Sequence, residues 1–385
     1  MVDIVPPVPA NLVQYITNGV FPYHKYFLDA PETMFRRLVE TVSETSVEPY
    51  NVKGVTERQI LTIDPEYPEK PLFRSQFDVD VDPGYLFLKL PKDHFYMFDA
   101  LSDWFNEESR MEASFADYES PIDWWSEYKN REHTLIAAYV LAKERGEDQP
   151  MLSDLRTAMF RSSRLFKSIP RLNSQLGVRE TQQFSPLFTR FLIQLFSTNP
   201  TCVNVLDISA GWGDRLLGSI AAGVNSYLGY DPNSKLQRGY NSIIKKFGDR
   251  ERHQVIQSPF ENAKLQPETY DLVISSPPFF TVEHYTKEGP QSEISYNTFD
   301  VWLKEFLFRS VTIAWNALVP GGYLILYLAD VRELKYKKPL SKLFSFIYEH
   351  FTDVFYLGAI GRGKLDVTTE GIPILAPVFV WWKYG

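Results

Sequence analysis

The run Tyr270-Asp-Leu-Val-Ile-Ser-Ser-Pro-Pro-Phe-Phe280 places the strongest constraint on how this chain can fold. Its first half is a short apolar run of β-prone residues, which is typical of a buried strand in a parallel sheet. Two consecutive prolines cannot continue a strand ladder, so the backbone must leave the sheet in an extended, rigid form. Ligands of open α/β sheets bind just beyond the carboxyl ends of strands. The loop from Ser276 to Phe279 is therefore a candidate site.

Further strand patterns flank this run and alternate with helical patterns over about 180 residues. The turn signal Pro320-Gly-Gly322 leads from a predicted helix at 298–318 into one of these strands. Such alternation predicts an α/β fold with a doubly wound, mostly parallel sheet, closed by an antiparallel pair. The predicted strands are Val203–Ser209, Tyr227–Asp231, His253–Ser258, Tyr270–Ser275, Tyr323–Leu328, Asp353–Ala359 and Ala376–Trp382.

The chain has 385 residues, more than a single domain usually holds, so two domains are expected. We predict an accessory or target-recognition domain at residues 1–150, mixed but mainly helical, and the α/β domain at residues 151–385. In the first domain, helices are predicted at 31–44, 93–115 and 121–147, and a β-hairpin around the turn Asp82-Pro-Gly84. A core stripe at helical spacing comprises Trp124, Trp125, Tyr128, Leu135, Tyr139 and Leu141.

The composition indicates an ordinary soluble protein that acts inside the cell. Cys202 is the one cysteine, which excludes an intramolecular disulfide, and with only six histidines no Cys/His metal site is expected. No signal peptide and no apolar run long enough to span a membrane is evident. Cytoplasm and nucleus are not distinguished by these features.

The charge of the chain is unevenly distributed. The formal net charge is −8, whereas a dedicated nucleic-acid binder is usually basic. Acidic residues dominate from Asp103 to Glu127, which indicates either a solvated face or a docking surface for a basic protein partner. A basic cluster then follows without an intervening acid, and it suits either phosphate contact or simple charge balance on a surface helix. Its members are Arg156, Arg161, Arg164, Lys167 and Arg171.

Two acids end the first two strands of the α/β domain. Asp207 precedes the turn Ser209-Ala-Gly-Trp-Gly213, in which Gly211 and Gly213 let a ligand approach the backbone and a helix N-terminus. Asp231 ends the second strand, where a carboxylate suits the two hydroxyls of a ribose. The turn lacks the three-glycine spacing of a dinucleotide site.

The order Asp207-Ile-Ser-Ala-Gly-Trp-Gly213, Asp231, Ser276-Pro-Pro-Phe279 and Pro320-Gly-Gly322 resembles class I S-adenosylmethionine-dependent methyltransferases. More narrowly it resembles the amino-methyltransferases that carry an Asp/Asn/Ser-Pro-Pro-Tyr/Phe/Trp tetrad. The resemblance covers residues 180 to 385 and implies a seven-stranded methyltransferase sheet with S-adenosylmethionine as cofactor. Phe184-Ser-Pro186 resembles the segment that covers the methionine end of the cofactor in DNA amino-methyltransferases. Ser209 stands where many relatives have glycine, a change that a small hydroxyl should tolerate.

The resemblance also implies roles for the tetrad. An exocyclic amine of adenine or cytosine is a poor nucleophile because its lone pair is delocalised into the ring. Ser276 Oγ and the Pro277 carbonyl would accept its hydrogens, Pro278 would hold both acceptors rigid, and Phe279 would stack on the extruded base. For the cofactor, Asp207 is expected near the methionine end or as organiser of the glycine turn, Asp231 at the ribose and Glu261 near the adenine.

The predicted substrate contacts are Phe280, Glu283, His284 and Tyr285, after the tetrad, and Arg161, Arg164 and Lys167 of the basic cluster. Cys202 has no proline before it, which argues against covalent methylation of a cytosine ring carbon. The first reading is therefore a DNA amino-methyltransferase that acts on N4 of cytosine or N6 of adenine. Methylation of an RNA base, methylation of a protein glutamine and a non-catalytic partner subunit stay open as alternatives.

Overall fold

A computed structural model of the protein describes residues 6–44, 74–75, 86–90, 98–165, 178–328, 338–367 and 373–385. The chain divides into two compact units, each built from separate stretches of sequence. Unit 1 comprises Met1–Ala30, Asn106–Gln182 and Glu283–Lys287, and unit 2 comprises Pro31–Phe105, Gln183–Val282 and Glu288–Gly385. The functional division predicted near residue 150 stays a prediction.

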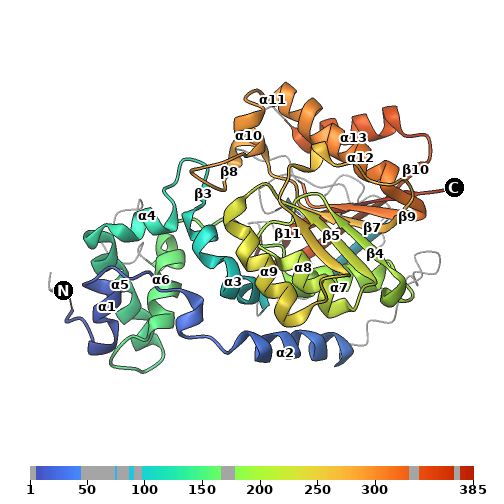
Figure 1. Cartoon of the computed structure of the whole chain (residues 1–385). Helices are drawn as coiled ribbons and strands as arrows, with labels where there is room; N and C mark the ends of the chain where they lie inside the picture. Colours follow the sequence, from blue (N-terminus) through green and yellow to red (C-terminus); the bar gives the residue numbers. More distant parts are fainter. Residues whose placement is uncertain are drawn as a thin grey trace, which may run out of the picture. The chain divides into compact units, whose positions relative to one another are not determined.

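Unit 2 contains the predicted sheet (Figure 1). The strand order is β2-β10-β11-β9-β7-β4-β5-β6, and β1 pairs with β11 outside this path. All pairs among β4, β5, β6, β7 and β9 are parallel, while β11 runs antiparallel to both β9 and β10. The doubly wound, mostly parallel seven-stranded sheet and its antiparallel closing pair are thus confirmed. The strands are β4 (Asn204–Asp207), β5 (Ser226–Tyr230), β6 (His253–Ile256), β7 (Tyr270–Ser275), β9 (Leu318–Leu326), β10 (Val354–Val367) and β11 (Pro373–Lys383).

Helices cover both faces of this sheet. On one side lie α7 (Pro186–Leu195), α8 (Asp214–Ala222) and α9 (Gln237–Phe247), and on the other lie α12 (Arg309–Ala317) and α13 (Pro339–His350) (Figure 1). The helix predicted at 298–318 is interrupted, because α11 (Phe299–Val301) and α12 flank a π-helix, η10 (Trp302–Phe308). Unit 2 also holds α2 (Pro31–Glu44) and α10 (Ser292–Ser295), whereas α3 (Asp99–Glu112) runs through both units.

The Pro320-Gly-Gly322 turn is part of β9 rather than a connection before it. Gly321 has φ 90°, and the pairing of β7 with β9 shifts register between Tyr270 and Leu272. A positive φ and a register shift identify a bulge, which glycine accommodates without steric cost. The expected turn is therefore a kink inside a continuous strand.

The hairpin predicted around Asp82-Pro-Gly84 is wrong for the strands that the structure describes. β1 (Arg74–Ser75) pairs in parallel with β11, and β2 (Leu86–Leu90) pairs in parallel with β10. Both strands extend the large sheet instead of pairing with each other. The turn itself lies outside the described residues.

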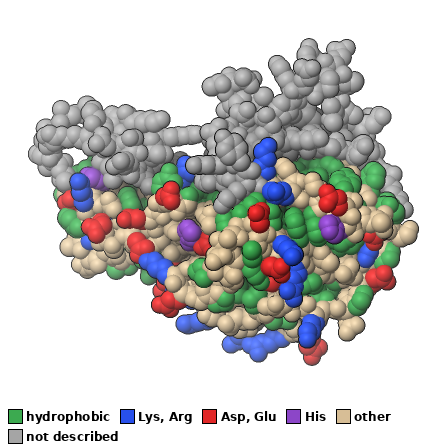
Figure 2. Space-filling model, turned by 90° about the horizontal axis from the view of Figure 1, so that it is seen from above, with side chains coloured by type: hydrophobic (Ala, Val, Ile, Leu, Met, Phe, Trp, Pro, Cys, Tyr) green, Lys and Arg blue, Asp and Glu red, His purple; other side chains and the backbone are tan. Residues whose placement is uncertain are grey.

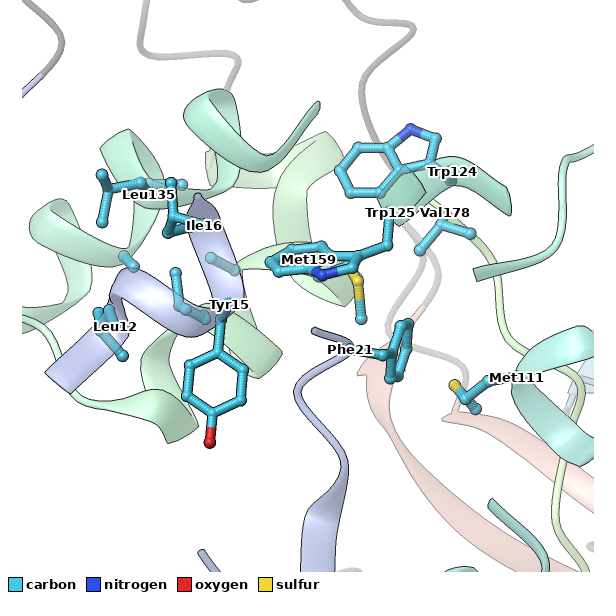
Figure 3. Close-up of a cluster of buried hydrophobic side chains, with 14 residues drawn as sticks. Leu12, Tyr15, Ile16, Phe21, Met111, Trp124, Trp125, Leu135, Met159 and Val178 are labelled. Carbon is cyan, nitrogen blue, oxygen red and sulfur yellow. The ribbon is translucent and has the colours of Figure 1, made fainter. Parts of the chain in front are cut away.

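Unit 1 is mainly helical around an aromatic core (Figure 3). Trp124, Trp125 and Leu135 of the predicted stripe are buried in this core, and Tyr139 and Leu141 pack against it. Tyr128 is an exception, since 48% of it is exposed. The unit contains α1 (Val13–Ile16), α4 (Pro121–Ser126), α5 (Tyr128–Glu144), α6 (Leu152–Leu165) and a two-stranded sheet of β3 (Ser114–Phe115) and β8 (Glu283–His284).

Arg156 departs from the predicted basic surface. Its guanidinium is buried, lies 2.8 Å from the Glu107 carboxylate and faces the rings of Phe21 and Phe160. A buried, paired arginine holds the unit together and is not available for phosphate. Part of the acidic stretch is likewise buried, because Glu107 is only 2% exposed.

Short 3-10 helices complete the described elements: η1 (Ala10–Leu12), η2 (His24–Tyr26), η6 (Pro200–Cys202), η7 (Ser234–Leu236), η8 (Phe260–Asn262) and η9 (Phe280–Val282). Within the described ranges, no helix is long and apolar enough to cross a membrane.

Candidate functional site

The site lies where β4 and β7 end side by side in the sheet. The chain continues from β4 to β5 on one side, while β7 lies on the other, so the strand order reverses between them. Such a switch point is where open α/β sheets bind ligands. A hydrogen bond from Ser275 Oγ to Asp207 Oδ1, 2.8 Å long, ties the two strand ends together. The glycine turn and the tetrad loop therefore start from one fixed point.

Asp207 is the centre of a buried polar network. It is fully buried, and its Oδ1 accepts from the Ser209 N–H (3.1 Å) as well as from Ser275. Its Oδ2 accepts from Arg215 Nε (2.7 Å) and from the Tyr227 hydroxyl (2.8 Å). A carboxylate has about four acceptor directions, and all are used by the protein. These contacts tie Asp207 to Ser209 at the start of the glycine turn, and its role beside a cofactor stays a prediction.

Arg215 completes this network from the first turn of α8. Burial works to lower the pKa of Arg215, but the combined effects of Asp207, Tyr227 and Asp214 outweigh it and raise the pKa. Burial, followed by the charge of Asp207, raises the pKa of Tyr227 well above its usual value. Arg215 also donates to the Ser209 carbonyl, so the same side chain fixes both the acid and the turn behind it.

The two glycines of the turn adopt conformations that favour glycine. Gly211 has φ 62° and Gly213 has φ 97°, and Gly213 is the N-cap of α8. The Gly211 N–H donates to Asp231 Oδ2 over 3.0 Å, which joins the turn after β4 to the end of β5. The turn that leads into the α8 N-terminus is thus held against the end of β5.

Asp231 is buried beside this turn. Its Oδ1 accepts from the Asn233 N–H over 2.9 Å, and Oδ2 accepts from Gly211. Burial raises the pKa of Asp231 to about 6, although the backbone N–H groups of Asn233 and Gly211 oppose the shift. The carboxylate is thus oriented before any ligand arrives, and it is charged only above weakly acidic pH.

Glu261 is a buried acid with one carboxylate oxygen that could accept a further hydrogen bond. It is 4% exposed, its Oε1 accepts from the Tyr296 hydroxyl over 2.9 Å, and its buried Oε2 has no hydrogen-bond partner among the residues that the structure describes. Burial raises the pKa of Glu261. An unsatisfied buried oxygen is costly, so it marks a place where a ligand donor would fit.

The tetrad forms an irregular loop directly after β7, as predicted. Ser276 is half-buried and Pro277 is buried. Within the described part of the chain, neither the Ser276 hydroxyl nor the Pro277 carbonyl takes part in a hydrogen bond. Both acceptors that the resemblance assigns to the amine therefore remain available. Phe280 follows with φ 53°, a strained conformation for this residue, and packs against Phe299 and Trp302, while its predicted substrate contact stays a prediction.

Aromatic rings connect the tetrad to the predicted methionine end of the cofactor site. Phe279 is 5% exposed and lies 5.5 Å from the ring of Tyr327, which lies 6.4 Å from the ring of Phe184. The guanidinium of Arg215 lies 5.0 Å from the Phe184 ring, which leads back to Asp207. The rings of Phe279 and Tyr327 are tilted by 55° to each other.

The segment around Phe184 is fixed by helix packing. Pro186 is the first residue of α7, the Ser185 side chain does not cap this helix, and Ser185 has φ 67°. A Cβ atom at Gly218 of α8 would collide with the Pro186 carbonyl and the Thr189 side chain. Glycine there lets α7 lie close against α8, next to the glycine turn.

The other predicted substrate contacts belong to unit 1 or lie outside the described residues. Glu283, His284 and Tyr285 belong to unit 1, where β8 pairs with β3 and the Tyr285 hydroxyl donates to Glu283 Oε2 over 2.6 Å. Arg161 and Arg164 lie on α6, but their side chains lie outside the described residues, as does Lys167 entirely.

Several residues of the site were missed by sequence reasoning. Ser275, Arg215, Tyr227 and Tyr240 support the two acids, and Tyr327 links the aromatic rings. The sequence offered one signal for Ser275. Successive side chains of a strand point to opposite faces, so only one of the adjacent residues Ser275 and Ser276 can face Asp207. For Tyr327, the only signal was its place at the end of an apolar strand.

Comparison with known proteins gives distant likenesses. No protein-family model and no curated protein matches the sequence. Among solved structures, a Thermotoga maritima S-adenosylmethionine-dependent O-methyltransferase is 13% identical, with TM-score 0.35 over 53% of this chain and 68% of that chain. A Clostridium thermocellum protein described as an rRNA methylase is 15% identical, with TM-score 0.36 over 53% of this chain and 98% of that chain. At these values the likenesses add no argument about function, which rests on the residues themselves.

Proposed function

We propose that this protein transfers a methyl group from S-adenosylmethionine to the exocyclic amine of a nucleic-acid base, most simply N4 of cytosine or N6 of adenine in DNA. One observation carries the proposal. Two available acceptors, Ser276 Oγ and the Pro277 carbonyl, stand on a rigid loop whose first residue follows the Ser275–Asp207 hydrogen bond. The methyl-donor site and the amine acceptors would thus share one anchor.

The residues present fit the cofactor. Asp231 offers an oriented carboxylate for the ribose hydroxyls, and Oε2 of Glu261, which has no partner among the described residues, offers an acceptor for the adenine amine. Gly211 and Gly213 carry no side chains that would block a ligand beside the turn, while Phe184, next to Arg215, would line the methionine end. When bound, S-adenosylmethionine supplies an electrophilic methyl group on a sulfonium.

The chain's own contribution is to orient and activate the amine. Acceptance of both amine hydrogens by Ser276 Oγ and the Pro277 carbonyl draws the nitrogen towards tetrahedral geometry and localises its lone pair. Because the two prolines fix these acceptors in advance, they stabilise the positive charge that develops on nitrogen without a reorganisation cost. Phe279 orients the ring by stacking.

Two measurements test this proposal. Calorimetry should show S-adenosylmethionine binding by the wild type and weakened binding by Asp231→Ala, and no binding by the wild type would refute every enzymatic reading. Labelled donor is then incubated with separate DNA, RNA and protein pools, followed by nucleoside and amino-acid mass spectrometry. Label in methylcytosine or methyladenine of DNA supports the proposal, whereas label in RNA or in glutamine would select one of the alternatives.

A further inference from the structure

A basic groove lies in unit 2 between helices η10–α12 and α13, apart from the residues of the candidate site. It has a volume of about 820 Å³. Figure 2 looks onto the side where these helices lie in Figure 1, and blue side chains cross that face with red ones between them. We call this groove the α12–α13 groove. The charged and aromatic lining residues used in the argument below are Lys304, Phe308, Arg309, Lys338, Lys342 and Phe346.

The groove concentrates positive charge in an acidic protein. Its four cations, Lys304, Arg309, Lys338 and Lys342, are all exposed, against two lining acids, Asp300 and Glu349. Among the described residues, only Lys304 of these four forms an ion pair, at 3.8 Å from Glu305. With a net charge of −8 for the whole chain, such a surplus is a local feature that would attract a polyanion.

Aromatic rings form one wall of the same groove. Phe308 and Phe346 stack with centroids 4.2 Å apart and an interplanar angle of 2°, and His350 lies 4.2 Å from Phe346. His350 is exposed, and its Nδ1 lies 2.9 Å from the Phe346 carbonyl oxygen, which fixes the ring orientation. A flat, exposed ring at the end of a stack beside cations is the combination that binds single-stranded nucleic acid.

The groove is built on an unusual helix that also packs against the tetrad loop. Leu303, Lys304 and Phe308 come from the π-helix η10, a conformation that is rare and frequent at functional sites. The first residue of η10, Trp302, lies 5.6 Å from the ring of Phe280, which directly follows the tetrad. A seven-residue helix therefore joins the wall of the groove to the loop that would hold the target base.

From this geometry we propose that the α12–α13 groove binds a single-stranded stretch of the nucleic acid that flanks the target base. Phosphates would contact Arg309, Lys338 and Lys342, and a base would stack on the exposed face of His350. The inference rests on the proposed function, because it names where the substrate of that site continues. It assigns target binding to unit 2, in addition to the contacts expected from the domain at residues 1–150 and from the basic cluster.

The test measures binding of a fluorescent single-stranded DNA of about 16 nucleotides by the full chain, as anisotropy over a series of salt concentrations. Lys338→Glu/Lys342→Glu is compared with Lys245→Glu/Lys264→Glu, which makes the same charge change at exposed positions of unit 2 that do not line the groove. Losing two phosphate contacts should lower the log–log salt slope by about 1.4 and raise Kd roughly tenfold or more near 50 mM salt. The control pair should keep the wild-type slope.

Each other outcome overturns the proposal. Absence of binding by the wild type, or an equal loss in both double variants, would show that the groove is not the binding surface. Competition by poly-glutamate as effective as that by unlabelled DNA would indicate an acidic protein partner instead. Methyl transfer is not read in this assay, so failure of the proposed activity and failure of the groove are distinguished.

Discussion

The loops after β4 and β7 begin at neighbouring strand ends but are held in different ways. The turn after β4 is held from inside by a buried acid, a buried arginine and a tyrosine hydroxyl. The described contacts of the loop after β7 include ring packing of Phe279 against Tyr327 and of Phe280 against Trp302, and three residues after Phe280 the chain enters β8 of unit 1.

This difference matches the tasks proposed for the two loops. A cofactor site benefits from a geometry that is complete before the ligand binds, because preorganised groups cost nothing to align. A loop that receives an extruded base needs acceptors that are not already occupied, which is what Ser276 and Pro277 provide. Substitutions in the first loop should therefore mainly lower the free energy of unfolding, whereas substitutions in the second loop should mainly lower the rate of methyl transfer.

The largest effect is expected from breaking the network of the first loop. Asp207→Ala leaves Arg215 buried without its counter-charge, which typically costs about 3–5 kcal/mol in the free energy of unfolding. Chemical denaturation measures the change. Tyr227→Phe, which removes one hydrogen bond to the same carboxylate, should cost about 1.5–3 kcal/mol. Equal costs for the two variants would contradict a network centred on Asp207.

The second loop is tested by Phe279→Leu, which keeps an apolar side chain but loses the ring. Base stacking contributes roughly 1–3 kcal/mol, so methyl transfer should fall about tenfold to a hundredfold. Cofactor affinity should stay at the wild-type value, because Phe279 lies outside the glycine turn. Single-turnover kinetics together with calorimetry separate the two quantities. A parallel loss of cofactor binding would mean that the loops are not independent.

Asp231 provides a pH-dependent test of the first loop. Burial raises its pKa to about 6, so below that pH the carboxyl is protonated and no longer an anionic acceptor for the ribose. Cofactor affinity should then fall by about tenfold per pH unit below 6 and level off above it. Calorimetry from pH 5 to 8 checks this, with Asp231→Asn as the variant whose affinity is low and flat. A wild-type affinity that does not change between pH 5 and 7 would remove Asp231 from the ribose site.

Local patterns in the sequence were enough to predict most of unit 2, because each strand and its following turn are encoded within about ten residues. The acids Asp207 and Asp231 were found for that reason. Contacts between distant segments were not visible: Tyr327 reaches Phe279 from the end of another strand, and β2 pairs with β10 across most of the chain. The hairpin prediction failed on this point, since a turn signal says nothing about which strand becomes the neighbour.

The smallest effect is expected from the segment Glu283–Lys287, which follows the second loop in the chain and belongs to unit 1. Lys287 Nζ lies 2.8 and 2.6 Å from the two carboxylate oxygens of Asp123, but 62% of the lysine is exposed. Lys287→Ala should therefore lower stability by less than about 1 kcal/mol. Burial works to raise the pKa of Asp123, yet hydrogen bonds from Lys287 and Ser120 leave it below the ordinary 3.8.

The sign of the pH dependence follows from that lowered pKa. A carboxyl with a folded-state pKa below its unfolded value stabilises the protein above the unfolded pKa, and this contribution is lost as the pH falls through the folded pKa. Below pH 3.8, the free energy of unfolding should fall less steeply with pH in Lys287→Ala than in the wild type. Near pH 7, its pH dependence should be nearly the same in the two proteins. Denaturation at pH 3 to 7 measures both. If Lys287→Ala instead lost methyl transfer while its stability stayed unchanged, the ion pair would have a role in positioning the tetrad. The second loop would then depend on a defined polar contact, as the first loop does.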